Sequence, residues 1–443
     1  MSSPLRFLCV LFTAKLSIVG GGFACPHHER SGRLTSCLFT PIPFWTPFAQ
    51  IEACLLPCLS AAWPVLFGPA ADPPRSILLS LERWQAALAS AAQIRLHPGD
   101  EAWASQTGTI SSRDVVVRCG RDNLNECLRD PSRAAIDRLA ARLAANLTSG
   151  ARPRHGAAMH LHAFQPFPQI PKYEADGRTP VWSATAPAIA GLTYYSTNPL
   201  FRRGDVVPVP LGVRDRLLPP GAVVRGRDAD EALLEWDATL RRLGRERGRD
   251  EWPARPTTLH CGGYRLKYGG GSGLGHNYGR AVAVRALRAN GFTSCGDGER
   301  PDDATSASSA AAAAVAAEAP GTPAHARAAS HAAHADALAR SRFVAAPRGN
   351  GIATWRAWES LLVGAIPVIK RRDHGQHGDT HGALYEKLPV IVVEDWSEVT
   401  PALLEERAAA IYAAPPATYD IGVALLPHWI GEIFNSTLSA LGV

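Results

Sequence analysis

Residues Ser341–Lys370 read SRFVAAPRGNGIATWRAWESLLVGAIPVIK, and this stretch decides the fold. The apolar run that ends at Pro347 predicts a strand, and Gly349-Asn350-Gly351 predicts a turn where backbone can approach a ligand closely. Ala353–Leu362 has helical periodicity, and Ala365–Ile369 follows as a short apolar run. The stretch therefore predicts a strand, a glycine turn, a helix and a second, buried strand.

The expected helix has two distinct faces. Trp355, Trp358 and Leu362 recur at helical spacing on one face, and their size and spacing favour core packing over sugar stacking. Arg356 and Glu359 share another face near the helix start, where backbone N–H groups attract anions. The pattern predicts a site for an anionic group, with a carboxylate one turn further along; a surface ion pair is the alternative.

Composition restricts the class of protein. The 443 residues with 46% apolar content are enough for two ordinary globular domains. The formal charge of +6 is modest, and the arginines are spread along the chain without forming one stripe. No helix-turn-helix, zinc-finger or RNP-like pattern occurs, so we expect no nucleic-acid partner.

Strand-like and helix-like segments alternate, which predicts an α/β fold with parallel sheets. A charged, proline-rich segment near residue 250 divides the chain into residues 73–250 and 255–443, with an alanine-rich insertion at 302–337. Expected helices include Ser76–Ala92, Pro131–Leu147, Asp228–Leu243, Arg280–Ala289 and one that begins at Thr400-Pro401. Expected strands include Asp114–Arg118, Leu192–Ser196, Val206–Leu211, Thr257–Cys261 and Val390–Val393.

Residues 1–72 form an anchor-like or poorly defined region. Arg6 precedes an apolar run that Lys15 interrupts, and Leu38–Ala71 is apolar but broken by prolines. A signal peptide, a single membrane anchor and a misplaced translation start all fit this pattern. Sequons at Asn146 and Asn435 fit a secretory route, so we expect a Golgi-type lumenal location.

The nine cysteines form no CxxC pair, which argues against a zinc ribbon or a thioredoxin-type motif. Cys119 with Cys127, and Cys261 with Cys295, could each form a disulfide in an oxidising lumen. Buried free thiols are the alternative.

Two common nucleotide motifs do not fit. Gly349–Thr354 follows a strand and opens a helix, but it lacks the third glycine of a dinucleotide fingerprint and the acidic residue further on. Gly269–Gly279 is rich in glycine but lacks the GK[ST] ending of a P-loop. Neither NAD chemistry nor ATP hydrolysis is expected.

The motifs that remain occur in a fixed order: PRGNG, RAWESL, GAIPVI, LYEKLP and DWSEV. Over residues 338–406 the chain resembles exostosin-like glycosyltransferases, in which a Pro-x-Gly turn, an Arg-x-Trp-Glu helix, a Gly-x-Ile-Pro-Val-Ile strand and a later Leu-Pro strand follow one another. Val206–Gly212 and Gly262–Lys267 are weaker echoes of the same family. The first seventy-odd residues and the alanine-rich insertion show no resemblance.

The resemblance implies a GT-B architecture: two Rossmann-like domains facing a cleft, with the acceptor bound by 73–250 and the donor by 255–443. It implies transfer of a sugar from a nucleoside diphosphate, UDP favoured, to a glycan or glycoprotein hydroxyl. The alternative is an inactive glycan- or nucleotide-sugar-binding protein of the same fold. Glu359 would accept hydrogen bonds from the ribose, whereas backbone amides and cations would bind the diphosphate. The expected donor-binding residues are Arg265, Lys267, Arg348, Gly349, Asn350, Gly351, Thr354, Arg356 and Glu359.

A catalytic base is harder to find. Inverting transfer needs a carboxylate or histidine beside the acceptor hydroxyl. Asp215 follows the VVPVPLG strand, at the end where α/β clefts form, and is the first candidate. His160 and His162 are rivals in the same half.

No metal site is assigned from the sequence. Asp228-Ala229-Asp230 has the DxD pattern that binds Mn²⁺ in other glycosyltransferases, but it lies in a charged linker. A loop with ligand-like spacing, His374, His377, Asp379 and His381, could bind zinc; a polar loop near the cleft is the default.

Overall fold

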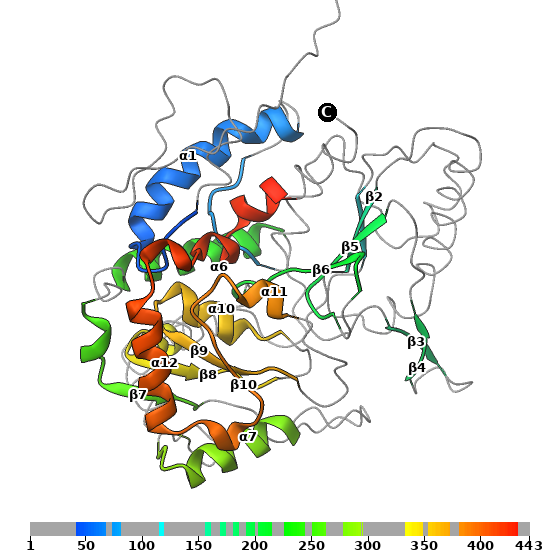
Figure 1. Ribbon diagram of the computed structural model, residues 1–443. Helices are drawn as coiled ribbons and strands as arrows, with labels where there is room; N and C mark the ends of the chain where they lie inside the picture. The colour runs from blue at the N-terminus through cyan, green and yellow to red at the C-terminus, as the bar shows by residue number, and fades with distance from the viewer. Residues whose placement is uncertain are drawn as a thin grey trace, which may run out of the picture.

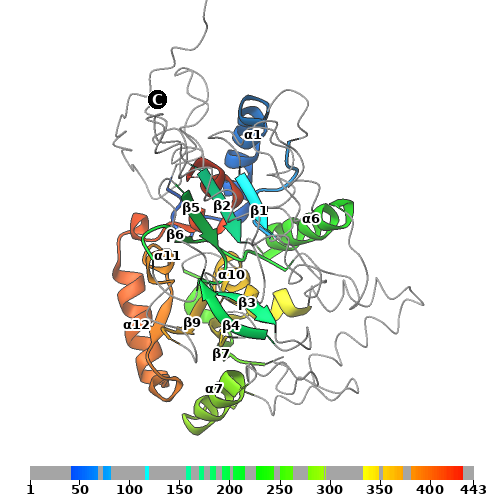
Figure 2. The same cartoon turned by 90° about the vertical axis from the view of Figure 1, so that its right-hand side faces the viewer.

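The computed structural model describes residues 41–67, 73–80, 115–118, 156–160, 169–173, 180–185, 192–199, 203–214, 226–243, 250–262, 278–293, 295, 333–348, 353–372 and 381–432. Within these ranges, helices alternate with strands that form two four-stranded parallel sheets. The chain is therefore an α/β protein, as the sequence predicts. Figures 1 and 2 show the two sheets in separate parts of the molecule, one above the other.

The first sheet has the strand order β1-β2-β5-β6 and is parallel throughout. Its strands are β1 (Val115–Arg118), β2 (Gly156–His160), β5 (Leu192–Ser196) and β6 (Val206–Pro208). An antiparallel pair, β3 (Gln169–Tyr173) and β4 (Pro180–Thr185), lies apart from this sheet. The sequence correctly predicts β1 to within one residue and both ends of β5, and β6 ends three residues early.

The second sheet has the order β10-β9-β8-β7, so neighbours in the chain are neighbours in space. Its strands are β7 (Thr257–His260), β8 (Ser341–Ala345), β9 (Ile366–Lys370) and β10 (Ile391–Val393). The connecting and following helices are α7 (Tyr278–Ala289), a helix over 333–339, α10 (Trp355–Leu362), α11 (Gly382–Tyr385) and α12 (Pro401–Ala413). Short 3₁₀ helices are η3 (Trp252–Ala254), η4 (Trp396–Glu398), η5 (Pro416–Thr418) and η6 (Ile421–Ala424).

Alternate residues of β8 enter two different cores, because side chains along a strand point to opposite faces. Phe343 and Ala345 join the outer core, which α7, α12 and η4 cover. Val344, with Ala346 just after the strand, joins the central core, which contains α10. Helices on both faces explain why the second sheet consists of nearly continuous apolar runs. Figure 1 shows α7 and α12 on the outside of this sheet and α10 toward β6.

The central core also contains both ends of the described chain. α1 (Phe48–Phe67) and α6 (Gly226–Leu243) pack into it, and a bidentate ion pair between Glu52 and Arg241 joins the two helices. Residues 41–67, which the sequence assigned to the anchor-like or poorly defined region, thus belong to this core. Among the described helices, none is long and apolar enough to cross a membrane.

The segment that follows α12 returns to the amino-terminal part of the chain. Leu425 forms a β-bridge with Leu78, and Ile42 donates a backbone hydrogen bond to Asp420 Oδ1 at 2.8 Å. Residues 421–430 therefore pack against the amino-terminal segments 42–79, even though the sequence places them in the carboxyl-terminal domain.

The predicted start of one helix is wrong. Residues 76–80 of the predicted helix Ser76–Ala92 are extended, with Leu78 and Ser80 in β-bridges to Leu425 and Val213. These residues are buried on all sides, so tertiary pairing overrides their helical periodicity. Residues 81–92, the expected helix Pro131–Leu147, both sequons and the insertion up to 332 lie outside the described residues.

Capping residues mark the start of α12 and the end of α10. Thr400 Oγ1 accepts a hydrogen bond from Leu403 N at 3.1 Å, and Pro401 occupies the first turn of α12. Gly364 ends α10 with a φ of 73°, in the left-handed region that favours glycine. Both ends agree with the sequence prediction.

The disulfide Cys261–Cys295 is present, with a Cα–Cα distance of 4.8 Å. It ties the carboxyl end of β7 to the segment after α7. Cys54 and Cys58 of α1 are also disulfide-bonded. Cys119 and Cys127 lie outside the described residues.

Candidate functional site

A cavity of about 340 Å³ lies against the second sheet, on the face that carries α10 and α11. Its basic lining residues follow strands: Arg348 comes after β8, and Lys370 and Arg371 end and follow β9. Thr354, at the N-cap of α10, and His381, at the N-cap of α11, also line it. The carboxyl ends of parallel strands are where open α/β sheets bind ligands.

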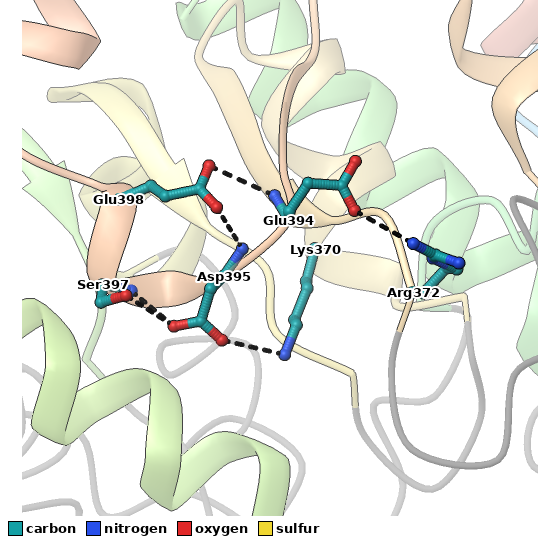
Figure 3. A network of polar contacts seen from close by, with 6 residues as sticks. All are labelled: Lys370, Arg372, Glu394, Asp395, Ser397 and Glu398. Carbon is teal, nitrogen blue, oxygen red and sulfur yellow. Dashed lines mark hydrogen bonds and ion pairs between the residues drawn. The ribbon is translucent and has the colours of Figure 1, made fainter.

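Acidic residues that follow β10 pair with the basic residues at and after the end of β9, and Figure 3 shows the pairs of Lys370 and Arg372. Lys370 Nζ lies 3.2 Å from Asp395 Oδ2, and Arg371 Nε lies 2.5 Å from Glu394 Oε1. Arg372 Nη2 reaches the other oxygen of Glu394 at 3.8 Å. The pairs hold cationic side chains at the rim of the cavity and leave a mixed-charge surface beside it.

The acidic residues are themselves held by η4. Asp395 Oδ1 accepts hydrogen bonds from the backbone and the hydroxyl of Ser397, and Glu398 Oε1 accepts from Asp395 N at 2.9 Å (Figure 3). This capping box explains the DWSEV motif. The hydrogen bonds from Ser397, with Lys370 as a weaker cause, lower the pKa of Asp395.

Residues that directly follow β5 reach the same region from the first sheet. His381 Nε2 lies 3.4 Å from Thr197 O, and Asn198 Oδ1 accepts a hydrogen bond from Ala353 N at 3.0 Å. The His381 ring stacks on Tyr385, which in turn stacks on Trp358. The carboxyl ends of the two sheets therefore meet beside the cavity.

A second polar cluster lies along α10 and does not line the cavity. Arg356 Nη1 donates to Gly262 O at 2.9 Å, just after β7. Glu359 is buried; its Oε1 accepts from Arg214 N at 3.2 Å, and its Oε2 lies 2.9 Å from His334 Nε2. The structure thus separates residues that the sequence combined into one donor site: Arg348 and Thr354 line the cavity, whereas Arg356 and Glu359 do not.

Comparison with known proteins assigns no family. No protein-family model matches the chain. No curated protein is significantly similar to it. Function is therefore inferred from the residues themselves: the ordered motifs, the cavity and the polar cluster on α10.

Several predicted site residues lie outside the described residues: Asp215, His162, Arg265, Lys267, Gly349, Asn350, Gly351, His374, His377 and Asp379. His160 ends β2, and Asp228-Ala229-Asp230 lies in the first turns of α6. Among the residues that the structure describes, no group of three potential ligands could hold a metal ion.

The structure adds four residues to the candidate site. Lys370 and Arg371 end a buried strand in the sequence IPVIKRR, a signal that could have been used. His260 ends β7 and is close enough to Arg356 and His334 to be affected by their charges. His334 lies within the alanine-rich insertion at 302–337, whose sequence gives no sign of function. Its role depends on a partner, Glu359, 25 residues further along the chain.

His260 makes stability depend on pH. Burial, and then the charges of Arg356 and His334, lower its pKa to about 3. The unfolded chain therefore binds a proton near pH 6.5 that the folded protein rejects, so stability is lost as pH falls below 6.5. We expect this group alone to cost about 2 kcal/mol at pH 5.

The measurement is urea unfolding of the wild type and His260→Gln at pH 7 and pH 5. The variant should lose less stability between the two values than the wild type. An equal loss in both proteins would contradict the assignment to His260, because the similarly buried His428, with a pKa of about 4, contributes to both.

Proposed function

We propose that this protein is a glycosyltransferase that moves a sugar from a nucleoside diphosphate, UDP favoured, to a glycan or glycoprotein hydroxyl. The observation that carries the proposal is the cavity at the carboxyl ends of β8 and β9, with Arg348, Lys370 and Arg371 in its lining. It adjoins the strand–turn–helix stretch whose motifs resemble exostosin-like enzymes. The cavity has the size of a small-molecule site.

The lining suits the two parts of a nucleotide. Arginine and lysine side chains bind phosphate oxygens, and their charge stabilises a diphosphate as it leaves. The lining also includes apolar and aromatic side chains, among them Ile369, Val392 and Tyr419, which suit a flat base. On this proposal the diphosphate lies near Arg348 and Lys370.

The finer architecture is also part of the proposal. Two parallel sheets whose carboxyl ends meet support a GT-B arrangement, with the donor on the second sheet and the acceptor toward the first. The acceptor oxygen would attack the anomeric carbon, and the bond from that carbon to the diphosphate oxygen would break. The hydroxyl proton would pass to a base, for which Asp215, His160 and His162 stay candidates.

A lumenal, Golgi-type location belongs to the same proposal. The Cys261–Cys295 disulfide and the disulfide-bonded Cys54 and Cys58 support it, because disulfides persist in oxidising compartments. The sequons at Asn146 and Asn435 are consistent with it.

The alternative is a glycan- or nucleotide-sugar-binding protein of the same fold that catalyses no transfer. Both carboxylate oxygens of Glu359 are engaged within the protein, which favours a structural role for a residue expected to bind ribose. Binding without turnover would identify this alternative.

Titration with UDP tests the proposal. Arg348→Gln and Lys370→Gln should each weaken UDP binding about ten- to a hundredfold, because each removes a charged hydrogen-bond donor worth about 1.5–3 kcal/mol. Arg407→Gln, an exposed position on α12, is the matched control and should bind as the wild type does. The measurement is calorimetry, followed by assays of UDP-sugar hydrolysis and transfer.

Failure of the wild type to bind UDP, GDP or their sugars would refute the proposed function. Equal affinity in the wild type, Arg348→Gln and Lys370→Gln would refute the site. UDP binding with neither hydrolysis nor transfer across donor and acceptor panels would favour the binding protein instead.

A further inference from the structure

We infer that Glu359 is a positioning residue that holds the turn after β6 against α10, and that it does not bind the donor ribose. The inference rests on the proposed function, because the turn leads to the candidate base. Its two observations are the contacts of Glu359 and the way in which the chain around Arg214 is held.

The turn after β6 is fixed on several sides. Gly212 has a φ of 76°, which redirects the chain so that Val213 N donates to Leu79 O at 2.9 Å. The next residue is held through both backbone groups: Arg214 N donates to Glu359 Oε1, and Arg214 O accepts from Trp236 Nε1 at 3.1 Å. The backbone at Arg214 is thus held by α6 on one side and by α10 on the other.

The Arg214 side chain makes a second contact with α10. Its guanidinium carbon lies 5.2 Å from the centre of the Trp355 ring, a distance typical of a cation–π interaction. Trp355 and Glu359 are four residues apart, so both lie on one side of the helix. One helix of the second half therefore binds both the backbone and the side chain of one residue of the first half.

The remaining contacts of Glu359 oppose a ribose role. Its side chain is only 3% exposed, and His334 Nε2 lies 2.9 Å from Oε2, while Oε1 faces Arg214 N. A ribose that needs both oxygens would displace these two partners and leave a buried amide without an acceptor. The carboxylate is also outside the cavity whose lining includes Arg348 and Thr354.

The functional consequence follows from chain connectivity. Asp215, the first candidate for the base, is the residue after Arg214. An anchor at Arg214 fixes the backbone of the residue that precedes Asp215, and Asp215 itself lies outside the described residues. Loss of the anchor should therefore reduce turnover and leave nucleotide affinity nearly unchanged.

The structural test is hydrogen exchange at single-residue resolution in the full chain. In Glu359→Ala the Arg214 amide should exchange about ten- to a hundredfold faster, since it loses a charged acceptor. The Val213 amide, bonded to Leu79 O, is the internal reference and should not change. Glu359→Gln keeps an acceptor oxygen and should restore most of the protection. Glu405→Ala, which removes an exposed ion pair with Arg342, is the matched control.

The functional test compares UDP with 2′-deoxy-UDP. Glu359→Ala should bind both within about twofold of the wild type and keep the same ratio between them, while kcat for transfer falls at least about tenfold. Glu359→Gln should recover much of kcat. A loss of discrimination between the two nucleotides in Glu359→Ala would show that Glu359 binds ribose, and would overturn the inference.

The two proposals fail in different ways. A wild-type protein that binds no nucleotide refutes the proposed function, yet Arg214 exchange still tests the anchor. Unchanged Arg214 exchange in Glu359→Ala overturns the inference, whatever the nucleotide result. Faster exchange at Val213 and Arg214 together would mean general unfolding, and would also overturn it.

Discussion

Gly212→Ala is expected to destabilise the protein by at least about 3 kcal/mol. A Cβ at this position would lie 2.1 Å from Leu79 O, a backbone atom that cannot rotate away. The φ of 76° adds strain, because residues with a side chain rarely adopt it. The same backbone forms the bridge between Ser80 and Val213, so relief of the clash would break a contact between distant segments.

Two other glycines show how much of the destabilisation comes from the close contact with Leu79 O and how much from the backbone conformation. Gly291 has a φ of 90°, but no atom lies within 4 Å of a Cβ built at this position. Gly291→Ala should therefore lower the free energy of unfolding by the backbone strain alone, about 1 kcal/mol. Gly204 has neither a positive φ nor an atom within 4 Å of the added Cβ, so Gly204→Ala should change the free energy of unfolding by less than about 0.5 kcal/mol. Urea midpoints of the three variants give the comparison. A Gly212→Ala midpoint no lower than that of Gly291→Ala would show that the turn can yield.

Trp358→Ala is expected to cost about 3–5 kcal/mol, the range for truncating a large buried aromatic side chain. Trp358 is fully buried at the centre of α10, and its ring stacks on Tyr385 at 5.6 Å between centroids. Since Tyr385 lines the cavity, the variant should also weaken UDP binding. Urea unfolding measures the first effect and calorimetry the second.

Trp355→Ala is the control on the same helix. Trp355 is only partly buried: it packs against the edge of the central core, and the Arg214 guanidinium lies 5.2 Å from the centre of its ring. Its loss should therefore cost less than that of Trp358, about 1–2 kcal/mol. Equal destabilisation by the two variants would contradict the placement of α10, because Trp358 is fully buried in the central core, whereas Trp355 is only partly buried against it.

The second sheet could be predicted closely, because its signals are local. The helix at α10, its end at Gly364, the strand β9 and the N-cap of α12 each depend on residues within one or two turns. For Cys261 and Cys295 the sequence allows either a disulfide or two buried free thiols, and the structure has the disulfide.

The prediction failed where distant segments compete with local preference. Residues 76–80 have helical periodicity, yet they pair with Leu425 and Val213 and are extended. Residues 41–67 lie in the apolar stretch Leu38–Ala71, for which the sequence allows a membrane anchor, and in the structure α1 packs its apolar residues into the central core. Composition alone does not distinguish a helix buried in protein from one buried in lipid.

The order of motifs in Ser341–Lys370 predicts a strand, a helix and a second strand from sequence alone, and the structure has β8, α10 and β9 there. The prediction succeeds because each of these signals depends on residues that are close in the chain. Only the tertiary structure shows which residues of this stretch line the cavity and which contact distant parts of the chain. Thr354 lines the cavity, whereas Glu359 contacts Arg214, 145 residues earlier in the chain. The physical reason is that a carboxylate buried on α10 is stabilised by whichever donors the packing of the two sheets brings to it. Those donors come from loops that carry no local sign of their partner.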